Sequence, residues 1–277
     1  MAFHKDIALT PVKDGLFQTE IIEDYWIIVG PNGGYLGALL TSAGDIHVGK
    51  DSHQLRGLTI HYLSPPKLGT TQVSVETIRS GKSVDFVRFE MIQDSVIVLV
   101  ATGSWAKTSN GLELPQITMP EVPNPMECPT PVRLTETPTR LHEKWEIRSV
   151  DQAISRPATS SPSHVKSDLT WWIRPKEATP LTSGLLVAAA DALPPPIMVH
   201  FDQIQMAPTI DLTVHIRAEI KSVNWTPDSW MLVRFVTNHA SGGFIEEDGL
   251  VWNEEGILLC MSTVSYTHLT LPTIYSV

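Results

Sequence analysis

Apolar and polar residues alternate along four segments in the first half of the chain, which is the pattern of strands with one buried and one exposed face. The four segments are residues 55–63, 71–79, 84–92 and 96–105. Short connections separate them, and Ser80-Gly81 is a turn sequence, so we predict an antiparallel meander. Residues 16–28, earlier in the chain, also have a strand-like composition.

A run of small and apolar residues, 35–43, precedes the meander and predicts a buried helix. It follows a glycine-rich turn, Gly30-Pro31-Asn32-Gly33-Gly34, in which glycine permits positive φ and close backbone approach. The first N–H groups of such a helix lack intrahelical partners and can hold a carbonyl oxygen or an anion. The alternative is a tight turn that only packs the helix against the sheet.

A second buried helix is predicted in the other half of the chain, where small and apolar residues run from 184 to 193. Thr182 and Ser183 are candidate N-caps, and prolines at 194–196 prevent the helix from continuing. Asp191 is the one charged residue in this run. Burying a carboxylate costs several kcal/mol unless hydrogen bonds or a positive charge offset it. Asp191 is therefore either paired for structural reasons, the commoner case, or retained to handle a proton or a water.

The two halves resemble each other. Residues 107–138 are rich in Pro, Thr and Glu and predict an extended linker, and strands are again expected at 144–150 and 169–174. Leu58-Thr-Ile-His61 in the first half is echoed by Leu212-Thr-Val-His215 in the second. Each half is thus predicted to be a helix with an antiparallel sheet, an α+β arrangement.

Composition narrows the class of protein. A chain of 277 residues with 42% hydrophobic and 18% charged residues predicts a soluble globular protein of one large or two small domains. The net charge of -10 argues against nucleic-acid binding, and no segment is long enough for a membrane span. Cys128 and Cys260 lie far apart and indicate neither a disulfide framework nor a metal site.

The sequence Gly81-Lys82-Ser83 resembles the end of a phosphate-binding loop. It lacks the first glycine of that motif, because Glu76 stands at the position where the glycine is needed.

Several motifs, taken in order, resemble one known family. They are Gly30-Pro-Asn-Gly-Gly-Tyr35, Leu58-Thr-Ile-His-Tyr-Leu-Ser-Pro-Pro66, Arg79-Ser-Gly-Lys-Ser83, Ala190-Asp-Ala192 before Pro194-Pro195, and Pro208-Thr-Ile-Asp-Leu-Thr-Val-His215. From about residue 16 to 259, the chain is similar to the double hotdog acyl-CoA thioesterases of the thioesterase II type. This resemblance implies two hotdog modules, each a helix wrapped by an antiparallel sheet. We expect modules at residues 1–118 and 141–264, joined by a linker at 119–140.

The resemblance also implies an activity and a site. The family hydrolyses fatty acyl-CoA thioesters without a metal or an organic cofactor, and its catalytic Asp and Ser/Thr fall on Asp191 and Thr209. The carboxylate would deprotonate a water that the hydroxyl holds in line with the thioester carbon. Backbone N–H groups at Gly33, Gly34 and Tyr35 would stabilise the oxyanion. The substrate is expected to be an acyl-CoA or a carrier-bound acyl group. A homo-oligomer fits this expectation, as does a cytoplasmic location, and a peroxisomal one stays open.

The sequence departs from the family at its C-terminal end. The family's last strand has the form Gly-x-Leu-x-Ala-x-x-x-Gln, and its glutamine helps to hold the water. Here Gly256-Ile-Leu-Leu-Cys-Met261 follows the pattern, but Val264 stands in place of the glutamine. Residues 265–277 resemble neither the family nor a continuation of the strand, so we expect them to be a non-native appended tail.

Two other functions are considered. A hotdog dehydratase or hydratase would need an Asp/His acid–base pair on one helix, but residues 35–43 contain no histidine and His200 lies beyond the proline run. A non-catalytic protein that binds acyl thioesters is the second alternative; in it Asp191 is only paired and Val264 is natural. Release of thiol from acyl-CoA separates hydrolysis from binding.

Overall fold

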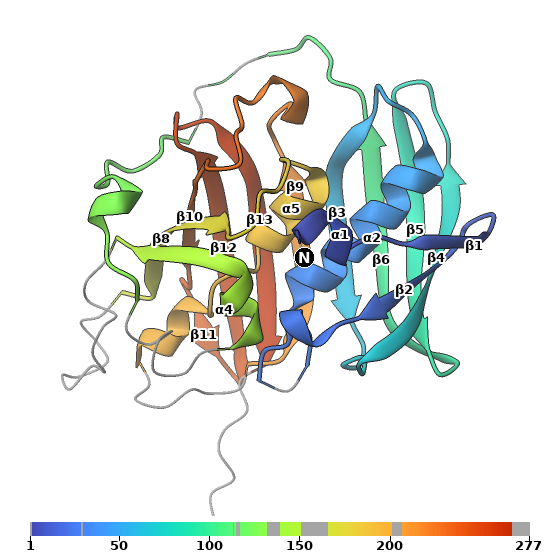
Figure 1. The fold of residues 1–277 in the computed structure, drawn as a ribbon, viewed down its shortest axis with the longest axis horizontal. Helices are drawn as coiled ribbons and strands as arrows, with labels where there is room; N and C mark the ends of the chain where they lie inside the picture. The colour runs from blue at the N-terminus through green and yellow to red at the C-terminus, as the bar shows by residue number, and fades with distance from the viewer. Residues whose placement is uncertain are drawn as a thin grey trace, which may run out of the picture.

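The computed structural model describes residues 2–28, 30–112, 114, 117–131, 139–150, 166–200 and 207–267. Within them, strands form one 13-stranded antiparallel sheet, and the two main helices pack beside each other against it (Figure 1). The α+β class predicted from the sequence is therefore confirmed.

The elements follow in chain order. They are α1 (Phe3–Asp6), β1 (Thr10–Lys13), β2 (Leu16–Ile21), η1 (Glu23–Tyr25), α2 (Gly33–Val48), β3 (Gln54–Tyr62), β4 (Gly69–Arg79), β5 (Val84–Gln93), β6 (Val96–Ala106), η2 (Pro125–Glu127), α4 (Arg140–Lys144), β7 (Trp145–Ser149), β8 (Asp168–Pro175), α5 (Ser183–Ala189), η5 (Pro196–His200), β9 (Thr209–Ile216), η6 (Ile220–Ser222), β10 (Met231–Val236), β11 (Ala240–Ser241), β12 (Phe244–Asn253) and β13 (Leu258–Thr267).

The repeated sequence motifs meet at the centre of the sheet. The strand order is β1-β2-β4-β5-β6-β3-β9-β13-β12-β10-β8-β7, with β11 beside β12, so β3 and β9 join the two halves. Thr59 lies directly opposite Thr213, and the Thr213 hydroxyl donates to Oγ1 of Thr59 over 3.1 Å. Because these threonines hold the same place in the two repeats, the halves are related by an approximate two-fold axis near this pair.

Small residues let the two helices run antiparallel at close range. A Cβ on Gly34 would lie 2.9 Å from the carbonyl oxygen of Ala188, and one on Gly184, at the other end of α5, would lie 3.6 Å from the carbonyl oxygen of Ala38. All seven residues of α5 are buried. The helix pair is thus a shared core of both halves.

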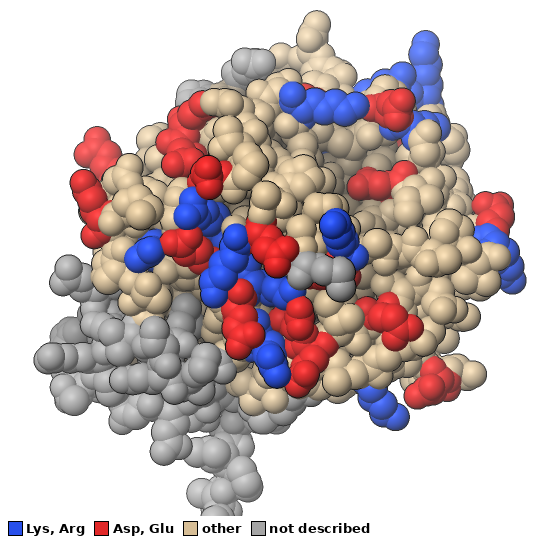
Figure 2. All heavy atoms as spheres, viewed as in Figure 1, with Lys and Arg blue, Asp and Glu red and all other residues tan. Residues whose placement is uncertain are grey.

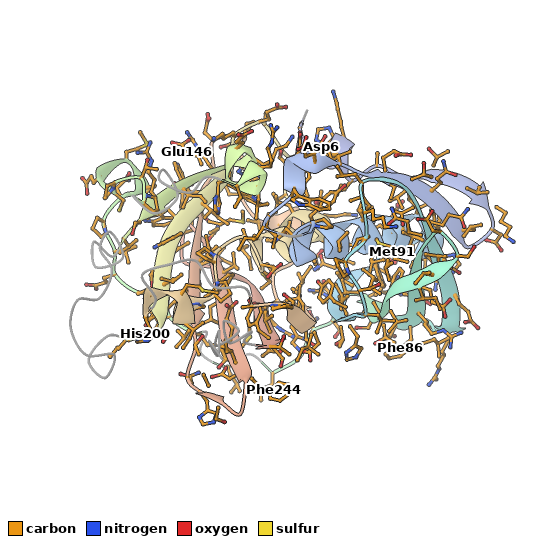
Figure 3. The ribbon with its side chains drawn as sticks, turned by 90° about the horizontal axis from the view of Figure 1, so that it is seen from below. Asp6, Phe86, Met91, Glu146, His200 and Phe244 are labelled. Atoms are coloured by element: carbon orange, nitrogen blue, oxygen red, sulfur yellow. The ribbon has the colours of Figure 1, made fainter. Side chains whose placement is uncertain are left out.

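Strand alternation separates a buried face from an outer face. On β5, Met91 is 0% exposed, whereas Phe86, on the other face, is 42% exposed (Figure 3). Residues 117–131 cover part of the outer face of the second half, where the indoles of Trp172 and Trp252 donate to the carbonyl oxygens of Pro123 and Ile117. The alternation predicted for residues 84–92 is therefore confirmed on β5.

Ion pairs tie the N-terminal segment to the second half. Nζ of Lys144, on α4, lies 3.0 Å from Oδ2 of Asp6, which also accepts a hydrogen bond from the Tyr25 hydroxyl.

On the face shown in Figure 2, acidic and basic side chains are interspersed. None of the helices in the described residues is long and apolar enough to cross a membrane.

Four predicted boundaries were wrong. The second helix, expected over residues 184–193, ends at Ala189, so Asp191 lies in the turn that follows it. The strand expected over residues 16–28 ends at Ile21, because η1 turns the chain inward and stacks buried Tyr25 on Tyr35 at a ring distance of 4.2 Å. The first helix extends to Val48, where Gly49 ends it at φ 58°. The last strand continues past Val264 to Thr267, because alternation places Tyr266 in the core, 3% exposed. Residues 268–277 lie outside the described residues, and the non-native origin of 265–277 stays a prediction.

Candidate active site

Asp191 lies where the end of α5 meets the start of α2. It follows the C-cap Ala190 and is 8% exposed. Its Oδ2 accepts hydrogen bonds from the backbone N–H of Gly34 at 2.7 Å and from Nδ2 of Asn32 at 2.9 Å. The carboxylate of one half is therefore held by the helix start of the other half, where N–H groups and the helix dipole favour a negative charge.

Asn32 fixes this arrangement from both sides. As the N-cap of α2, its Oδ1 accepts from the N–H of Tyr35 at 2.9 Å. Its Nδ2 also donates to the backbone oxygen of Asp191 at 2.7 Å. Asn32 was part of the predicted glycine turn but was not among the predicted site residues. An asparagine directly before a helix start is an N-cap signal that could have identified it.

Burial raises the pKa of Asp191 from 3.8 to about 6, against the opposing effect of hydrogen bonds from Gly34, Asn32 and Gly33. The carboxylate form therefore predominates at pH 7, while its basicity is greater than that of an exposed aspartate. A base with a pKa just below the working pH can accept a proton efficiently.

The three predicted oxyanion groups are at the site, but each of them already has a partner. Gly34 N–H binds Asp191 and Tyr35 N–H binds Asn32. The N–H of Gly33 also stabilises the Asp191 carboxylate. In this structure these groups therefore orient the aspartate, and their role toward an oxyanion stays a prediction.

Tyr62, from β3, closes one side of the site. Its hydroxyl donates to the carbonyl oxygen of Gly33 at 2.9 Å, and burial together with the charge of Asp191 raises its pKa. A Cβ on Gly33 would lie 2.8 Å from this hydroxyl and 3.0 Å from Oδ2 of Asp191. Only glycine fits between the two groups, which explains the residue at position 33. Sequence reasoning quoted Tyr62 within a motif but gave it no role.

A bulge in β9 lies next to Thr209. Ser265 of β13 lies opposite Asp211, but Tyr266 lies opposite Thr209, so Ile210 is the extra residue. Tyr266 is buried, whereas Thr209 is only half-buried at the start of β9. Among the described residues no hydrogen bond joins Thr209 to Asp191. The catalytic role predicted for Thr209 therefore stays a prediction.

Position 264 faces the same side. Val264 is 2% exposed and lies opposite Leu212 on β9 and Glu247 on β12. Glu247 is 1% exposed and was not predicted. Its Oε2 accepts a hydrogen bond from the Tyr266 hydroxyl at 3.1 Å. The alternation Ile245, Glu247, Gly249 marks it as an inward residue, a signal that the sequence did contain.

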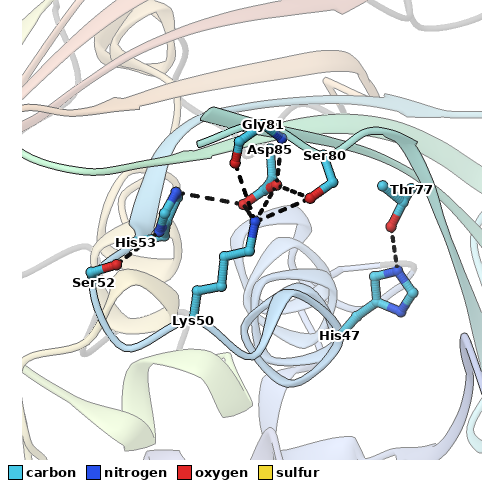
Figure 4. Close-up of polar contacts among 8 residues, drawn as sticks. All are labelled: His47, Lys50, Ser52, His53, Thr77, Ser80, Gly81 and Asp85. Carbon is cyan, nitrogen blue, oxygen red and sulfur yellow. Dashed lines mark hydrogen bonds and ion pairs between the residues drawn. The ribbon is translucent and has the colours of Figure 1, made fainter. Parts of the chain in front are cut away.

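A second polar cluster lies at the other end of α2 (Figure 4). Burial alone would raise the pKa of Asp85, but hydrogen bonds from Lys50 Nζ, the Ser80 hydroxyl and Gly81 N–H outweigh it and lower the pKa. The 16 residues of α2 put this cluster about 24 Å from Gly33. The Ser80-Gly81 turn is therefore part of a structural network that is separate from the Asp191 site.

Neither cysteine is a nucleophile at neutral pH. Burial raises the pKa of the Cys260 thiol to about 12, and it also raises that of Cys128. The thiols are thus in the unreactive protonated form. In the described residues no group of three or more His, Cys, Asp and Glu side chains could hold a metal ion.

Comparison with known families identifies the chain. A family model described as the acyl-CoA thioesterase N-terminal domain matches residues 22–106, and one described as the acyl-CoA thioesterase C-terminal domain matches residues 125–264. The chain belongs to the acyl-CoA thioesterase family. A search of curated proteins finds no match.

Solved structures confirm the fold of this thioesterase family member. A conserved protein of unknown function with a hot dog fold from Alicyclobacillus acidocaldarius has a TM-score of 0.85 at 22% identity, covering 97% of this chain and 98% of its own. The tesB protein of Mycobacterium avium subsp. paratuberculosis has a TM-score of 0.77 at 16% identity, with coverages of 97% and 98%. The acyl-CoA thioesterase II TesB2 of Mycobacterium marinum has a TM-score of 0.73 at 16% identity, with coverages of 98% and 99%. The predicted double hotdog fold is confirmed.

Proposed function

We propose that this family member hydrolyses fatty or related acyl-CoA thioesters with water activated by Asp191. The observation that carries the proposal is the geometry of this buried carboxylate, which Gly34 and Asn32 hold and whose pKa is raised to about 6. Its partners are hydrogen-bond donors only, since no Lys or Arg among the described residues forms an ion pair with Asp191, and this leaves the carboxylate more basic than an exposed aspartate. The two acyl-CoA thioesterase family models and the similarity to TesB2, described as an acyl-CoA thioesterase II, support the same substrate class.

The proposed reaction has two steps. Asp191 takes a proton from a water whose oxygen attacks the thioester carbon, while the Thr209 hydroxyl orients that water. The tetrahedral intermediate then expels the CoA thiolate, which takes the proton back from Asp191. The products are a free fatty acid and CoA thiol, and the aspartate is regenerated.

An acyl-thioester-binding protein is the second candidate, and one observation favours it. Val264 is buried on the site's face and can neither donate nor accept a hydrogen bond. Loss of one such positioning contact lowers the rate by about 10²–10³-fold. Binding without rapid turnover is the outcome expected of this second function. A carrier-bound acyl group as substrate, a cytoplasmic location and self-association stay predictions.

Thiol release decides between these functions. The purified chain is mixed with short-, medium- and long-chain acyl-CoA, and free thiol is followed with a chromogenic reagent. Asp191→Asn is the test variant. Asp45→Asn is the matched control, because Asp45 is a carboxylate late in the other helix that accepts a hydrogen bond from the Trp105 indole. Hydrolysis that Asp45→Asn preserves and Asp191→Asn removes supports the proposal. Saturable acyl-CoA binding without thiol release favours the binding protein.

A further inference from the structure

Glu247 is a buried carboxyl group that the proposed reaction does not yet use. It lies on β12 directly opposite Val264, so its side chain points to the same face as the site. Its Oε2 has the Tyr266 hydroxyl as a partner, but its buried Oε1 has no hydrogen-bond partner among the described residues. Because buried polar atoms are nearly always hydrogen-bonded, the unpaired Oε1 needs an explanation.

The surroundings of Glu247 favour its neutral form. Burial and the negative charge of Asp191 raise the pKa of Glu247 well above its usual range. Asp191 faces it from the end of α5 and Tyr266 from β13, and Glu246 and Asp248 flank it on β12. No Lys or Arg in the described part of the chain forms an ion pair with it. A neutral carboxyl group, unlike a carboxylate, can donate a hydrogen bond.

The site needs such a donor. The N–H groups of Gly33 and Gly34, which were expected to receive the oxyanion, stabilise Asp191. The hydroxyl of Tyr62 donates to Gly33. Val264 supplies no donor. Negative charge develops on the thioester oxygen during attack, and a preorganised donor aimed at that oxygen lowers the barrier.

We propose that Glu247, as a neutral carboxyl group, donates a hydrogen bond from Oε1 to the carbonyl oxygen of the bound thioester. The proton stays on Glu247 throughout, and Tyr266 holds the other oxygen in place. This inference rests on the proposed hydrolase function and deepens it. It assigns two buried carboxyl groups opposite forms, one ionised as a base and one neutral as a donor.

Glu247→Gln and Glu247→Leu separate this role from packing. The glutamine keeps a neutral group with an N–H donor, so kcat should stay within about threefold of the parent. The leucine removes the donor, so kcat should fall about a hundredfold with KM little changed. Asp248→Asn, exposed on the opposite face of the same strand, is the matched control and should keep the parental kcat.

A second measurement does not depend on catalysis. A Glu whose pKa is raised in the folded state binds more protons there, so its contribution to stability is lost as pH rises above its unfolded pKa of about 4.5. Glutamine does not titrate, so Glu247→Gln does not lose this stability as the pH rises. Its melting temperature relative to the parent should therefore increase steadily from about pH 4.5 to pH 8. A difference that is constant or falls with pH contradicts a neutral Glu247.

The outcomes distinguish the two proposals. If the parent releases thiol and folded Glu247→Leu is equally fast, Glu247 has no such role and the hydrolase function stands. A Glu247→Gln variant as slow as Glu247→Leu also overturns the donor role. If the parent and Asp191→Asn both release no thiol, the hydrolase function is refuted. The proposed hydrogen bond from Glu247 to the thioester is then refuted as well. The pH series then still shows whether Glu247 is neutral.

Discussion

Gly34→Ala should push the end of α5 away from the start of α2 and loosen the contact that orients Asp191. The new Cβ would lie 2.9 Å from both the carbonyl oxygen of Ala188 and the Cβ of Asp191, and 3.1 Å from the Cα of Ala188. Two of these atoms belong to the backbone, and none is the end of a flexible side chain. The helices must therefore separate by about half an ångström to restore ordinary contact.

The magnitude follows from three terms. Overpacking costs about 1–3 kcal/mol, and weakening the 2.7 Å bond from Gly34 N–H to Asp191 costs about 1 kcal/mol more. Alanine gains about 1 kcal/mol in helix propensity. The free energy of unfolding should therefore fall by about 2 kcal/mol, which lowers Tm by about 4–8 °C. The rate of thiol release should fall at least about tenfold, because a displaced Asp191 carboxylate is no longer positioned to take the proton from the water.

Gly184→Ala is the matched control at the opposite end of the same helix pair. Its Cβ would meet Cδ1 of Ile7, the mobile end of a long side chain, at 3.1 Å, and its other neighbours at 3.6 Å or more. Stability should change by less than about 1 kcal/mol, with activity retained. Urea denaturation and thiol release measure both variants. If Gly34→Ala is as stable and as active as Gly184→Ala, the close approach of the helices at Asp191 is not as described.

Three further predictions concern the halves, position 264 and pH. Residues 1–118 expressed alone should aggregate, because β3 loses β9 and α2 loses α5; a monomer with a cooperative melting transition would contradict this. Val264→Gln should raise kcat about tenfold or more without changing KM, and an unchanged kcat would remove the case for a missing contact. The parent's kcat/KM should fall below about pH 6, where Asp191 is protonated. Because folding raises that pKa from 3.8, parental stability should decrease by about 3 kcal/mol relative to Asp191→Asn as pH rises to about 6, which pH-dependent melting measures.

The sequence was sufficient to predict the secondary-structure elements that depend on a local hydrophobic pattern. Alternation located the long strands, and small-residue runs located both helices, because burial on one face leaves a periodic trace. It also found the repeat at Leu58–His61 and Leu212–His215. It did not reveal that these two segments pair with each other through Thr59 and Thr213, because strand pairing is a non-local contact.

Only part of the candidate site could be predicted from the sequence, because its geometry also depends on non-local contacts. Asp191 stood out as a lone charge in an apolar run that was predicted to be helical, and the structure brings it to the predicted glycine turn. The partners it finds there depend on the antiparallel crossing of α2 and α5. The pairing of Thr209 with Tyr266 depends on a bulge at Ile210, and that of Glu247 with Val264 depends on the register of β12 and β13. Neither a bulge nor a register is encoded in the periodicity of one strand.

The central claim is that the Asp191 carboxylate is the base, and Asp191→Asn tests it most directly. The amide oxygen can accept the same hydrogen bonds from Gly34 and Asn32 at 2.7 and 2.9 Å, so the fold should persist while the base is lost. Thiol release from an acyl-CoA hydrolysed by the parent should fall by about 10²–10⁴-fold, with Tm at pH 7.5 unchanged or higher. Asp45→Asn should remain active. Asp191→Asn activity within tenfold of the parent, or a collapse of its melting transition, would contradict the account.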